Sequence, residues 1–340
     1  MDKKFTTPKR EINSDSPVYI IAEIGMNHNG DAELGKQMIK AAADSGADAV
    51  KFQTFKTELL INKNSADFLT RKKYELSEDD HMEYMKYAQE NGINFFSTPF
   101  DLISVDLLDD IGVDIIKISS ADLTNYPLLK KVGKTKRPVI ISTGYSEISD
   151  IFHAKETLMQ HGAEQIAVMH CVASYPTADE DVNIQNISML SKMFKNNIIG
   201  FSDHSPDYTI IPSIAVSLGA RVIEKHFTID HNLSGYDHKM SLIPSQFTEM
   251  VKNIRRTEKI LGVSRMESGV VKSELARKTN AYRSLYWAKP VNKGEEVNSS
   301  NHVCKRPSGG LGVEFYEELI GMKLLNNVSE DELVKLGDVG

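Results

Sequence analysis

Eight short runs rich in Val, Ile and Phe recur between residues 18 and 227, and segments with helical spacing separate them. The runs cover residues 18–25, 49–54, 94–100, 115–120, 138–144, 165–171, 198–204 and 221–227. Such apolar runs are typical of parallel strands that are buried on both faces. Eight strands that alternate with helices predict an α/β fold, the (β/α)8 TIM barrel. A doubly wound open sheet is the alternative, but no G-x-G-x-x-G motif follows the first run.

The segments between the runs have the pattern of amphipathic helices. Ala, Leu and Met recur three and four residues apart in residues 32–46 and 78–92. Gly46 and Gly92 stand at the positions where a helix C-cap is expected. A further helix is predicted at 245–261, after the eighth run.

The last part of the chain has a different pattern. A TIM barrel takes about 250 residues, whereas this chain has 340. Residues 262–280 have little strand character, and a Gly-, Pro- and Asn-rich β-type module follows, with a helical patch at 314–321. We therefore predict a TIM-barrel catalytic domain at 1–262, a linker at 263–280 and a small β-rich domain at 281–340, with Trp287 in the small domain's core.

Composition excludes several classes of protein. The net charge of -7 disfavours broad nucleic-acid binding, although it leaves room for a small anionic ligand. There is no apolar run of membrane-spanning length, and the segment MDKKFTTPKREINSDSP lacks the apolar region of a secretory signal. Cys171 and Cys304 fit neither a disulfide framework nor a zinc motif. We expect a cytoplasmic protein with no membrane or nucleic-acid partner.

Polar or ionisable residues close every predicted strand, which is where TIM barrels carry their catalytic groups. They are Glu23, Lys51, Gln53, Ser97, Thr98, Lys117, Ser119, Ser120, Ser142, Thr143, His170, Ser202, Asp203, His204, Glu224, Lys225 and His226. The pattern predicts a polar, functional mouth of the barrel.

Two chemistries are indicated at this mouth. His204 and His226 end neighbouring strands, so both can bind one divalent metal, with Glu23 or water completing the site. The alternative is that each histidine is only a hydrogen-bonded residue near a strand end. Lys51 and Lys117, with nearby hydroxyl groups, can bind a phosphate and a carboxylate. Their alternative role is a structural ion pair.

Cys171 follows His170 directly, which suggests a nucleophile with its base. Adjacent strand residues point to opposite faces of a sheet, however, so these side chains are not expected to meet. We expect Cys171 to be structural.

Three functions follow from the pattern. The first is a metal-dependent enzyme that condenses an anionic three-carbon unit with an aldehyde. The second is a Schiff-base aldolase that uses Lys117 or Lys225 as its nucleophile. The third, a carbohydrate-binding protein without catalysis, does not require an ionisable mouth and is the weakest.

Several ordered motifs resemble those of the sialic acid synthase family. They are AEIGMNHNGD (22–31), KFQTF (51–55), FFSTPFD (95–101), IKISSADLTNYPLL (116–129), ISTG (141–144), HCVASYPT (170–177), GFSDHS (200–205) and GARVIEKHFT (219–228). RSLYWAKPVNKGEEV (283–297) and KRPSGG (305–310) resemble the antifreeze-like (SAF) domain that ends those enzymes. The similarity covers both predicted domains.

The resemblance implies a transferase that condenses phosphoenolpyruvate with an N-acetylated aldose such as N-acetylmannosamine. The product is a nine-carbon 2-keto sugar acid, phosphate leaves with C–O cleavage, and the cofactor is a divalent metal, Mn²⁺ or else Mg²⁺ or Co²⁺. It also implies a homodimer in which the SAF domain caps the partner's barrel, with Arg306 bound to the N-acyl group.

The matching motifs imply specific roles for residues of this chain. Phosphoenolpyruvate is assigned to Lys51, Thr98, Lys117, Ser120, Ser142, Ser202 and His204. The metal is assigned to His204 and His226, acid/base chemistry or positioning of water to Glu23, and the sugar to Gln53, Asp122, Tyr175 and Asp237.

Some positions depart from the family pattern. Ala173 stands where Asn or Ser is common, and Asp122 stands where Glu is often found. RPSGGLG is closer to the pseudaminic acid synthases, whereas EIGMNHNG and GYDHKMSL are closer to the sialic and legionaminic branch. The sugar, N-acetylmannosamine or a diacetamido-trideoxyhexose, is therefore left open.

Overall fold

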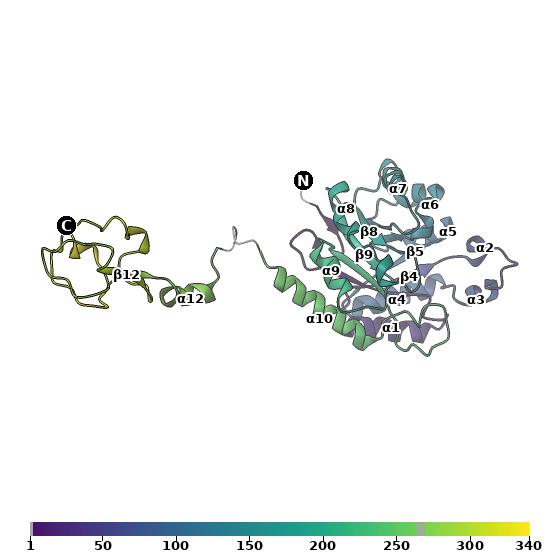
Figure 1. Ribbon diagram of the computed structural model, residues 1–340. Coiled ribbons are helices and arrows are strands. Elements are labelled where there is room, and N and C mark those ends of the chain that lie inside the picture. Colours follow the sequence, from purple (N-terminus) through teal and green to yellow (C-terminus); the bar gives the residue numbers. More distant parts are fainter. Residues whose placement is uncertain (1–2, 264–266, 268) are drawn as a thin grey trace. The chain divides into compact units, whose positions relative to one another are not determined.

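The computed structural model describes residues 3–263, 267 and 269–340 (Figure 1). The chain divides into two compact units, Met1–Leu261 and Gly262–Gly340. Residues 264–266 and 268 of the predicted linker lie outside the described residues. The described part of that segment contains a helix that the sequence did not predict, α12 (Lys272–Ala281).

The first unit is a closed barrel of eight parallel strands, as the sequence predicted. The strands are β3 (Tyr19–Gly25), β4 (Ala49–Thr54), β5 (Asn94–Pro99), β6 (Ile116–Ile118), β7 (Val139–Ser142), β8 (Ile166–Cys171), β9 (Ile198–Asp203) and β10 (Val222–His226). The last strand, β10, pairs with both β9 and the first barrel strand, β3, which closes the barrel. Each strand lies within a predicted run. β6 is the shortest because a 3-10 turn, η1 (Ser120–Asp122), begins two residues after it ends.

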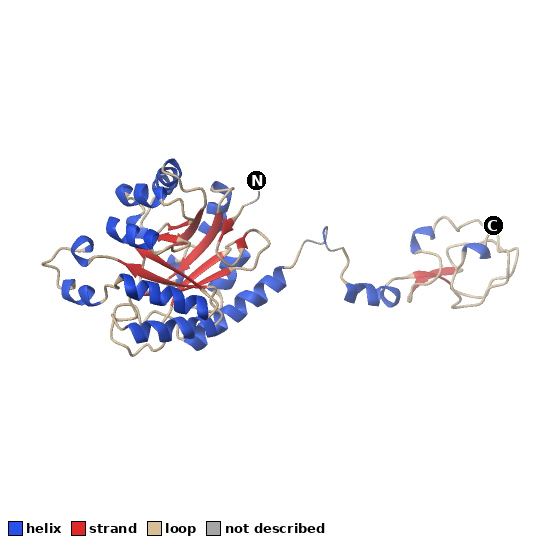
Figure 2. Cartoon of the chain, turned by 180° about the vertical axis from the view of Figure 1, so that it is seen from behind, coloured by secondary structure: helices blue, strands red, loops and turns tan. Residues whose placement is uncertain are grey.

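Helices surround the strands of this unit (Figure 2). They are α1 (Ala32–Asp44), α2 (Thr57–Leu60), α3 (Phe68–Lys73), α4 (Glu78–Glu90), α5 (Leu102–Asp110), α6 (Tyr126–Lys134), α7 (Ile148–Gln160), α8 (Asn186–Met193), α9 (Ile211–Ser217) and α10 (Pro244–Leu261), with a 3-10 turn η2 (Asp179–Asp181). Side-chain caps fix where helices begin: the Asp31 carboxylate accepts two backbone N–H bonds at α1, and Ser77 forms a capping box with Asp80 at α4. None of the described helices has the length and apolar character needed to span a membrane.

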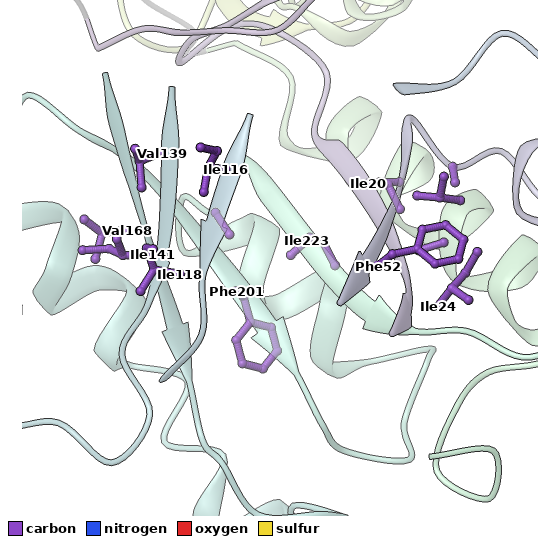
Figure 3. Close-up of a cluster of buried hydrophobic side chains, with 14 of the residues drawn as sticks. Ile20, Ile24, Phe52, Ile116, Ile118, Val139, Ile141, Val168, Phe201 and Ile223 are labelled. Carbon is purple, nitrogen blue, oxygen red and sulfur yellow. The ribbon is translucent and has the colours of Figure 1, made fainter. Parts of the chain in front are cut away.

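One face of each strand packs against the helices. Ile20, Phe52 and Ile141 belong to a large apolar cluster that also contains helix residues such as Met38 and Leu158. Figure 3 shows the strand residues of this cluster. It forms the layer between barrel and helices and holds the strands in register.

Alternate residues of the same strands form a second apolar cluster. Tyr19, Ala49 and Ile140 lie in it with Phe5 and Ile12, and no helix contributes to it among the described residues. Phe5 and Ile12 come from an N-terminal hairpin, β1 (Phe5–Thr6) and β2 (Glu11–Ile12). The polar N-terminal segment carried no strand prediction. Its two buried apolar residues nevertheless pack into the inward-facing cluster near the strands' N-terminal ends.

The second unit has its own small core. Strands β11 (Ser284–Trp287) and β12 (His302–Lys305) pair antiparallel. Trp287 is fully buried in an apolar cluster with Leu285 and Val297, as predicted. The predicted helical patch at 314–321 contains only a 3-10 turn, η3 (Val313–Phe315), and a second turn, η4 (Leu336–Asp338), lies near the C-terminus.

Candidate active site

The inward-facing positions change from apolar to polar toward the C-terminal ends of the barrel strands. Ala49 belongs to the inner apolar cluster, whereas Lys51, two residues later on β4, lines a cavity of about 290 Å³. Within the first unit, all residues to which the resemblance assigns a role, except Asp122, line this cavity. They are Glu23, Lys51, Gln53, Thr98, Lys117, Ser120, Ser142, Tyr175, Ser202, His204, His226 and Asp237.

A larger cavity of about 460 Å³ borders the first one at Cys171. Among the described residues that line it, Glu147 is the only carboxylate, and no Lys or Arg is present. The charged chemistry is therefore concentrated in the smaller cavity.

Two lysines and two carboxylates form the buried charged centre of the site. Lys51 Nζ lies 2.9 Å from Glu23 Oε2 and 3.6 Å from Glu224 Oε1. Lys117 Nζ lies 3.7 Å from the same Glu224 oxygen. The sequence placed Glu224 among the polar residues of the mouth but assigned it no role. The signal was present, because Glu224 stands two residues before His226 and so faces the same side of β10.

Hydroxyl groups complete this centre. Lys51 Nζ donates to Thr98 Oγ1 at 3.1 Å, and Lys117 Nζ donates to Ser142 Oγ at 2.6 Å. Because both hydroxyl oxygens accept from an ammonium group, their own O–H groups are free to donate to a ligand. Ser202 Oγ instead donates to Glu224 Oε1 at 3.1 Å.

The two carboxylates have different proton affinities. Burial is the largest cause that raises the pKa of Glu23, and together with the Glu224 carboxylate it brings this pKa to about 7 against the opposing effect of Lys51. Burial acts on Glu224 in the same sense, but Lys117 and Lys51 outweigh it and leave the pKa of Glu224 below its ordinary value. Burial also lowers the pKa of Lys117, with a contribution from Lys51. Glu23 is thus the group best suited to exchange a proton near neutral pH.

His204 and His226 face each other at the end of the barrel. Their ring centroids are 5.3 Å apart. His204 Nδ1 donates to the backbone oxygen of Val172 at 2.8 Å, which leaves Nε2 with a free lone pair. His226 Nδ1 is buried without a hydrogen-bond partner and lies 3.9 Å from Asp237 Oδ2.

This pair fits a divalent metal in its donor chemistry. A carbonyl that fixes the outer nitrogen of a histidine is the usual second contact of a metal-binding imidazole. No group of three His, Cys, Asp or Glu side chains within the described ranges is arranged to hold a metal by itself. Water or substrate oxygens would therefore have to complete the coordination.

Comparison with known proteins identifies the family. A model of the NeuB family matches residues 38–266, and a model of the SAF domain matches residues 282–340. The chain belongs to the NeuB family. Its C-terminal unit is a SAF domain, as the resemblance implied.

Known NeuB-like proteins match the chain over nearly its whole length. An uncharacterized protein of Methanocaldococcus jannaschii is 42% identical and covers 99% of both chains. The N,N'-diacetyllegionaminic acid synthase of Campylobacter jejuni is 40% identical over 93% of this chain and 98% of its own. The crystal structure of N-acetylneuraminic acid synthetase from Leptospira borgpetersenii, in complex with citrate, superposes with a TM-score of 0.76 at 35% identity, covering 82% of this chain and 95% of that one. The chain is therefore an enzyme of the nonulosonic acid synthase family.

Two residues assigned by the resemblance are not among those that build the barrel cavity. The Asp122 carboxylate accepts hydrogen bonds from Ser119 Oγ at 2.8 Å and Asn125 Nδ2 at 3.1 Å, so it stabilises the turn after β6. It does not line the cavity, and the predicted sugar contact is not part of this geometry. Arg306 belongs to the SAF domain, where its role remains a prediction.

Lys225 does not fit the nucleophile role considered from the sequence. Its Nζ donates to Asp203 Oδ2 at 2.6 Å and to the backbone oxygens of Ser205 and Asp207 at 2.6 and 2.8 Å. Since β-strand side chains alternate, Lys225 faces away from the barrel interior, opposite to Glu224 and His226. Only Lys117 of the two candidate Schiff-base lysines lines the cavity.

Other cavity residues were missed by sequence reasoning. Cys171 lines the cavity, and its Sγ atom lies 3.9 Å from His204 Nδ1. The side chain of His170 forms its hydrogen bond elsewhere, with the Val182 backbone oxygen, in agreement with the expectation that His170 and Cys171 do not meet. Met26 and Arg71 also line it. They come from segments beyond the strand ends, where no periodic pattern marks them.

Proposed function

We propose that this enzyme condenses phosphoenolpyruvate with an N-acylated hexosamine of the N-acetylmannosamine type. The product is a nine-carbon 2-keto sugar acid, and phosphate is released by cleavage of the C–O bond. The observation that carries the proposal is the pair of buried lysines, Lys51 and Lys117, beside free hydroxyl donors at the mouth of the barrel.

The charges in this centre suit a small dianionic substrate. Phosphoenolpyruvate carries a carboxylate and a phosphate, and Lys51 and Lys117 provide one ammonium group for each. Glu224 holds both ammonium groups within 3.7 Å of one oxygen, so they are positioned before the substrate binds. Thr98 and Ser142 then donate their O–H groups to the bound anion.

Glu23 is the proposed proton carrier. Its pKa of about 7 leaves it partly protonated at neutral pH. As C3 of the enol attacks the aldehyde carbon, protonated Glu23 gives its proton to the aldehyde oxygen. Water adds to C2, and its proton returns to the Glu23 carboxylate. The C2–O bond to phosphate then breaks, and the C2 hydroxyl proton leaves with the phosphate.

A divalent metal, Mn²⁺ in the proposal, would be held by His204 and His226. When bound, it would act as a Lewis acid toward the aldehyde. The described residues around it orient the sugar: Gln53 donates to Glu23 Oε1 at 3.2 Å, and Asp237 and Tyr175 line the same cavity.

The decisive experiment is turnover with labelled substrate. Purified protein with Mn²⁺ and phosphoenolpyruvate carrying ¹⁸O at the bridging oxygen is offered N-acetylmannosamine and the two diacetamido-trideoxyhexoses. We expect a nine-carbon product by mass and ¹⁸O retained in the released phosphate. Label found in the keto acid, or no phosphate release with any of these sugars, would contradict the proposal.

The Schiff-base alternative now depends on Lys117 alone. Burial lowers its pKa, which would favour a nucleophilic amine. Borohydride added during turnover would then trap an adduct on Lys117. We expect no adduct, together with loss of activity on chelation and recovery with Mn²⁺.

A homodimer in which each SAF domain caps the partner's barrel is part of the same proposal. It would let Arg306 reach the N-acyl group of the substrate. Arg306→Ala should then raise the KM for the sugar while leaving the KM for phosphoenolpyruvate unchanged, and mixing it with a His226→Ala variant should restore part of the activity through mixed dimers.

A further inference from the structure

Arg71 is a cation of the cavity that the proposed mechanism does not use. It belongs to α3, in the connection between β4 and α4, and lines the cavity together with Met26 and Phe100. The two cavity lysines have carboxylate partners. Arg71 has none: within the described part of the chain no carboxylate forms an ion pair with its guanidinium group.

The guanidinium group is nevertheless held in place. It stacks over the Tyr236 ring at 5.1 Å, and that ring makes an edge-on contact with Tyr74 at 5.9 Å. Its Nη1 atom has a thioether neighbour, Met26 Sδ, at 3.8 Å, and Nε is buried without a hydrogen-bond partner. A fixed guanidinium with unused donors leaves a desolvation cost that a ligand oxygen would remove.

The location of Arg71 assigns it to the sugar rather than to phosphoenolpyruvate. Tyr236, on which it stacks, directly precedes Asp237, and the Asp237 carboxylate lies 3.9 Å from His226. Phosphoenolpyruvate is already assigned to Lys51 and Lys117, which come from the strands themselves. Arg71 comes from a helix beyond the strand ends, on the side of the cavity with Asp237.

The surroundings of Arg71 favour an acyl group over a phosphate. Met26 lies in an apolar cluster with Phe55 and Tyr74, and Phe100 packs against that cluster. A sugar phosphate would need several donors or cations, and here it would meet one guanidinium, an apolar wall and the Asp237 carboxylate. An N-acetyl group combines one carbonyl acceptor with one methyl group, which matches one guanidinium beside Met26 and Phe100.

We propose that Arg71 donates to the carbonyl oxygen of an N-acyl group on the sugar, with the acyl methyl against Met26 and Phe100. This inference rests on the proposed function. One N-acyl group is assigned to Arg306 in the proposed function, so the acyl group bound by Arg71 is a second one. Within the N-acylated hexosamines of that function, Arg71 therefore selects diacylated over monoacylated sugars.

Calorimetric binding without phosphoenolpyruvate tests Arg71 directly, because no turnover is needed. The probes are a diacetamido-trideoxyhexose, N-acetylmannosamine and N-acetylmannosamine 6-phosphate, and phosphoenolpyruvate is titrated separately. The variants are Arg71→Gln and Arg71→Lys, and Lys73→Gln is the matched control, since Lys73 is an exposed cation on the same helix.

Arg71→Gln should weaken binding of the diacetamido sugar by about 10- to 100-fold, the usual effect of losing a charged hydrogen bond. Arg71→Lys should recover only part of this loss, and Lys73→Gln should leave every affinity unchanged. Binding of N-acetylmannosamine and phosphoenolpyruvate should change by less than about threefold.

Three results would overturn the inference. The first is that Arg71→Gln changes the affinities for the two neutral sugars equally or not at all. The second is that it weakens binding of N-acetylmannosamine 6-phosphate more than binding of the other sugars. The third is that it weakens binding of phosphoenolpyruvate. The proposed function fails by a different result, since it would be contradicted if the unmodified enzyme released no phosphate, whatever its affinities for the sugars.

Discussion

The interior of the barrel has two halves built by the same strands. In the half near the N-terminal strand ends, Tyr19, Ala49 and Ile140 pack with Phe5 of the hairpin into an apolar core. Toward the C-terminal ends, the next inward positions on the same strands are charged or polar, as with Lys51 after Ala49. The backbone geometry is the same in both halves. The type of residue at the inward-facing positions, which recur every second residue, therefore decides which half forms the core and which half forms the site.

The charged half is stable because its charges are balanced locally. Lys51 Nζ lies within 3.6 Å of both Glu23 and Glu224, Lys117 Nζ lies 3.7 Å from Glu224, and each lysine also donates to a hydroxyl group. An isolated buried charge would be far more costly. The apolar half needs no such balance, and we expect substitutions in the two halves to affect different quantities.

The largest effect on activity is expected for Lys117→Met. The variant should lose phosphate release by a factor of about 10³ or more, since a preorganised cation is removed from the anion pocket. Its melting temperature should fall only modestly, because burial already disfavours the Lys117 ammonium and because Glu224 keeps Lys51 as a second partner at 3.6 Å. A large fall in melting temperature would show that Lys117 is instead part of the structural core.

Lys225→Met tests the opposite face of β10. Lys225 and Asp203 form a buried pair at 2.6 Å, so removing one partner should lower the free energy of unfolding by about 4 kcal/mol. Activity per folded molecule should be largely kept. Urea unfolding measures the effect, and Lys225→Met combined with Asp203→Asn should recover part of the loss.

Ile140→Ala and Ser142→Ala compare the two halves along one strand, β7. Ile140 is fully buried in the apolar half, so its truncation should cost about 3 kcal/mol of stability and leave the KM values unchanged. Ser142→Ala should cost less than about 1 kcal/mol of stability and reduce kcat/KM for phosphoenolpyruvate by about tenfold. Equal effects on stability would contradict the division of the interior.

Glu23→Gln changes neither the core packing nor the anion pocket, and its expected effect on stability appears only when the pH is varied. The folded-state pKa of Glu23, about 7, lies above its ordinary value of 4.5, so the folded state binds this proton more tightly than the unfolded state. The stabilisation is complete below pH 4.5 and is lost as the pH rises through 7. Relative to the Glu23→Gln variant, the free energy of unfolding of the unmodified protein should fall by roughly 3 kcal/mol between pH 4.5 and pH 8. Urea titrations at several pH values measure this, and parallel curves would show that burial does not hold the proton on Glu23.

Strand periodicity predicted most of the fold and of the polar mouth. Every barrel strand lies within a run predicted from the sequence, and most of the polar residues that end those runs line one cavity; Ser97, Thr143, His170, Asp203 and Lys225 do not. Alternation along β10 also separates Glu224 and His226 from Lys225. A two-residue repeat is a local property of an extended chain, so it can be read from consecutive residues without knowledge of the fold.

Other features depend on contacts between distant segments. The burial of Phe5 and Ile12 requires a closed barrel for the hairpin to pack against. The balance of Lys51 and Lys117 by Glu224 joins three strands that are far apart in the sequence. The same is true of Arg71, which stacks on a tyrosine more than 160 positions later in the chain.

The sequence by itself determined the barrel, the SAF domain, the family and the set of polar residues at the strand ends, because these follow from local periodicity and ordered motifs. Only the tertiary structure decided which of those charges are balanced, which candidate nucleophilic lysine faces the cavity, and that Arg71 forms no ion pair with a carboxylate of the residues that the structure describes. Burial and the distance between charges set these properties, and both depend on how the whole chain packs.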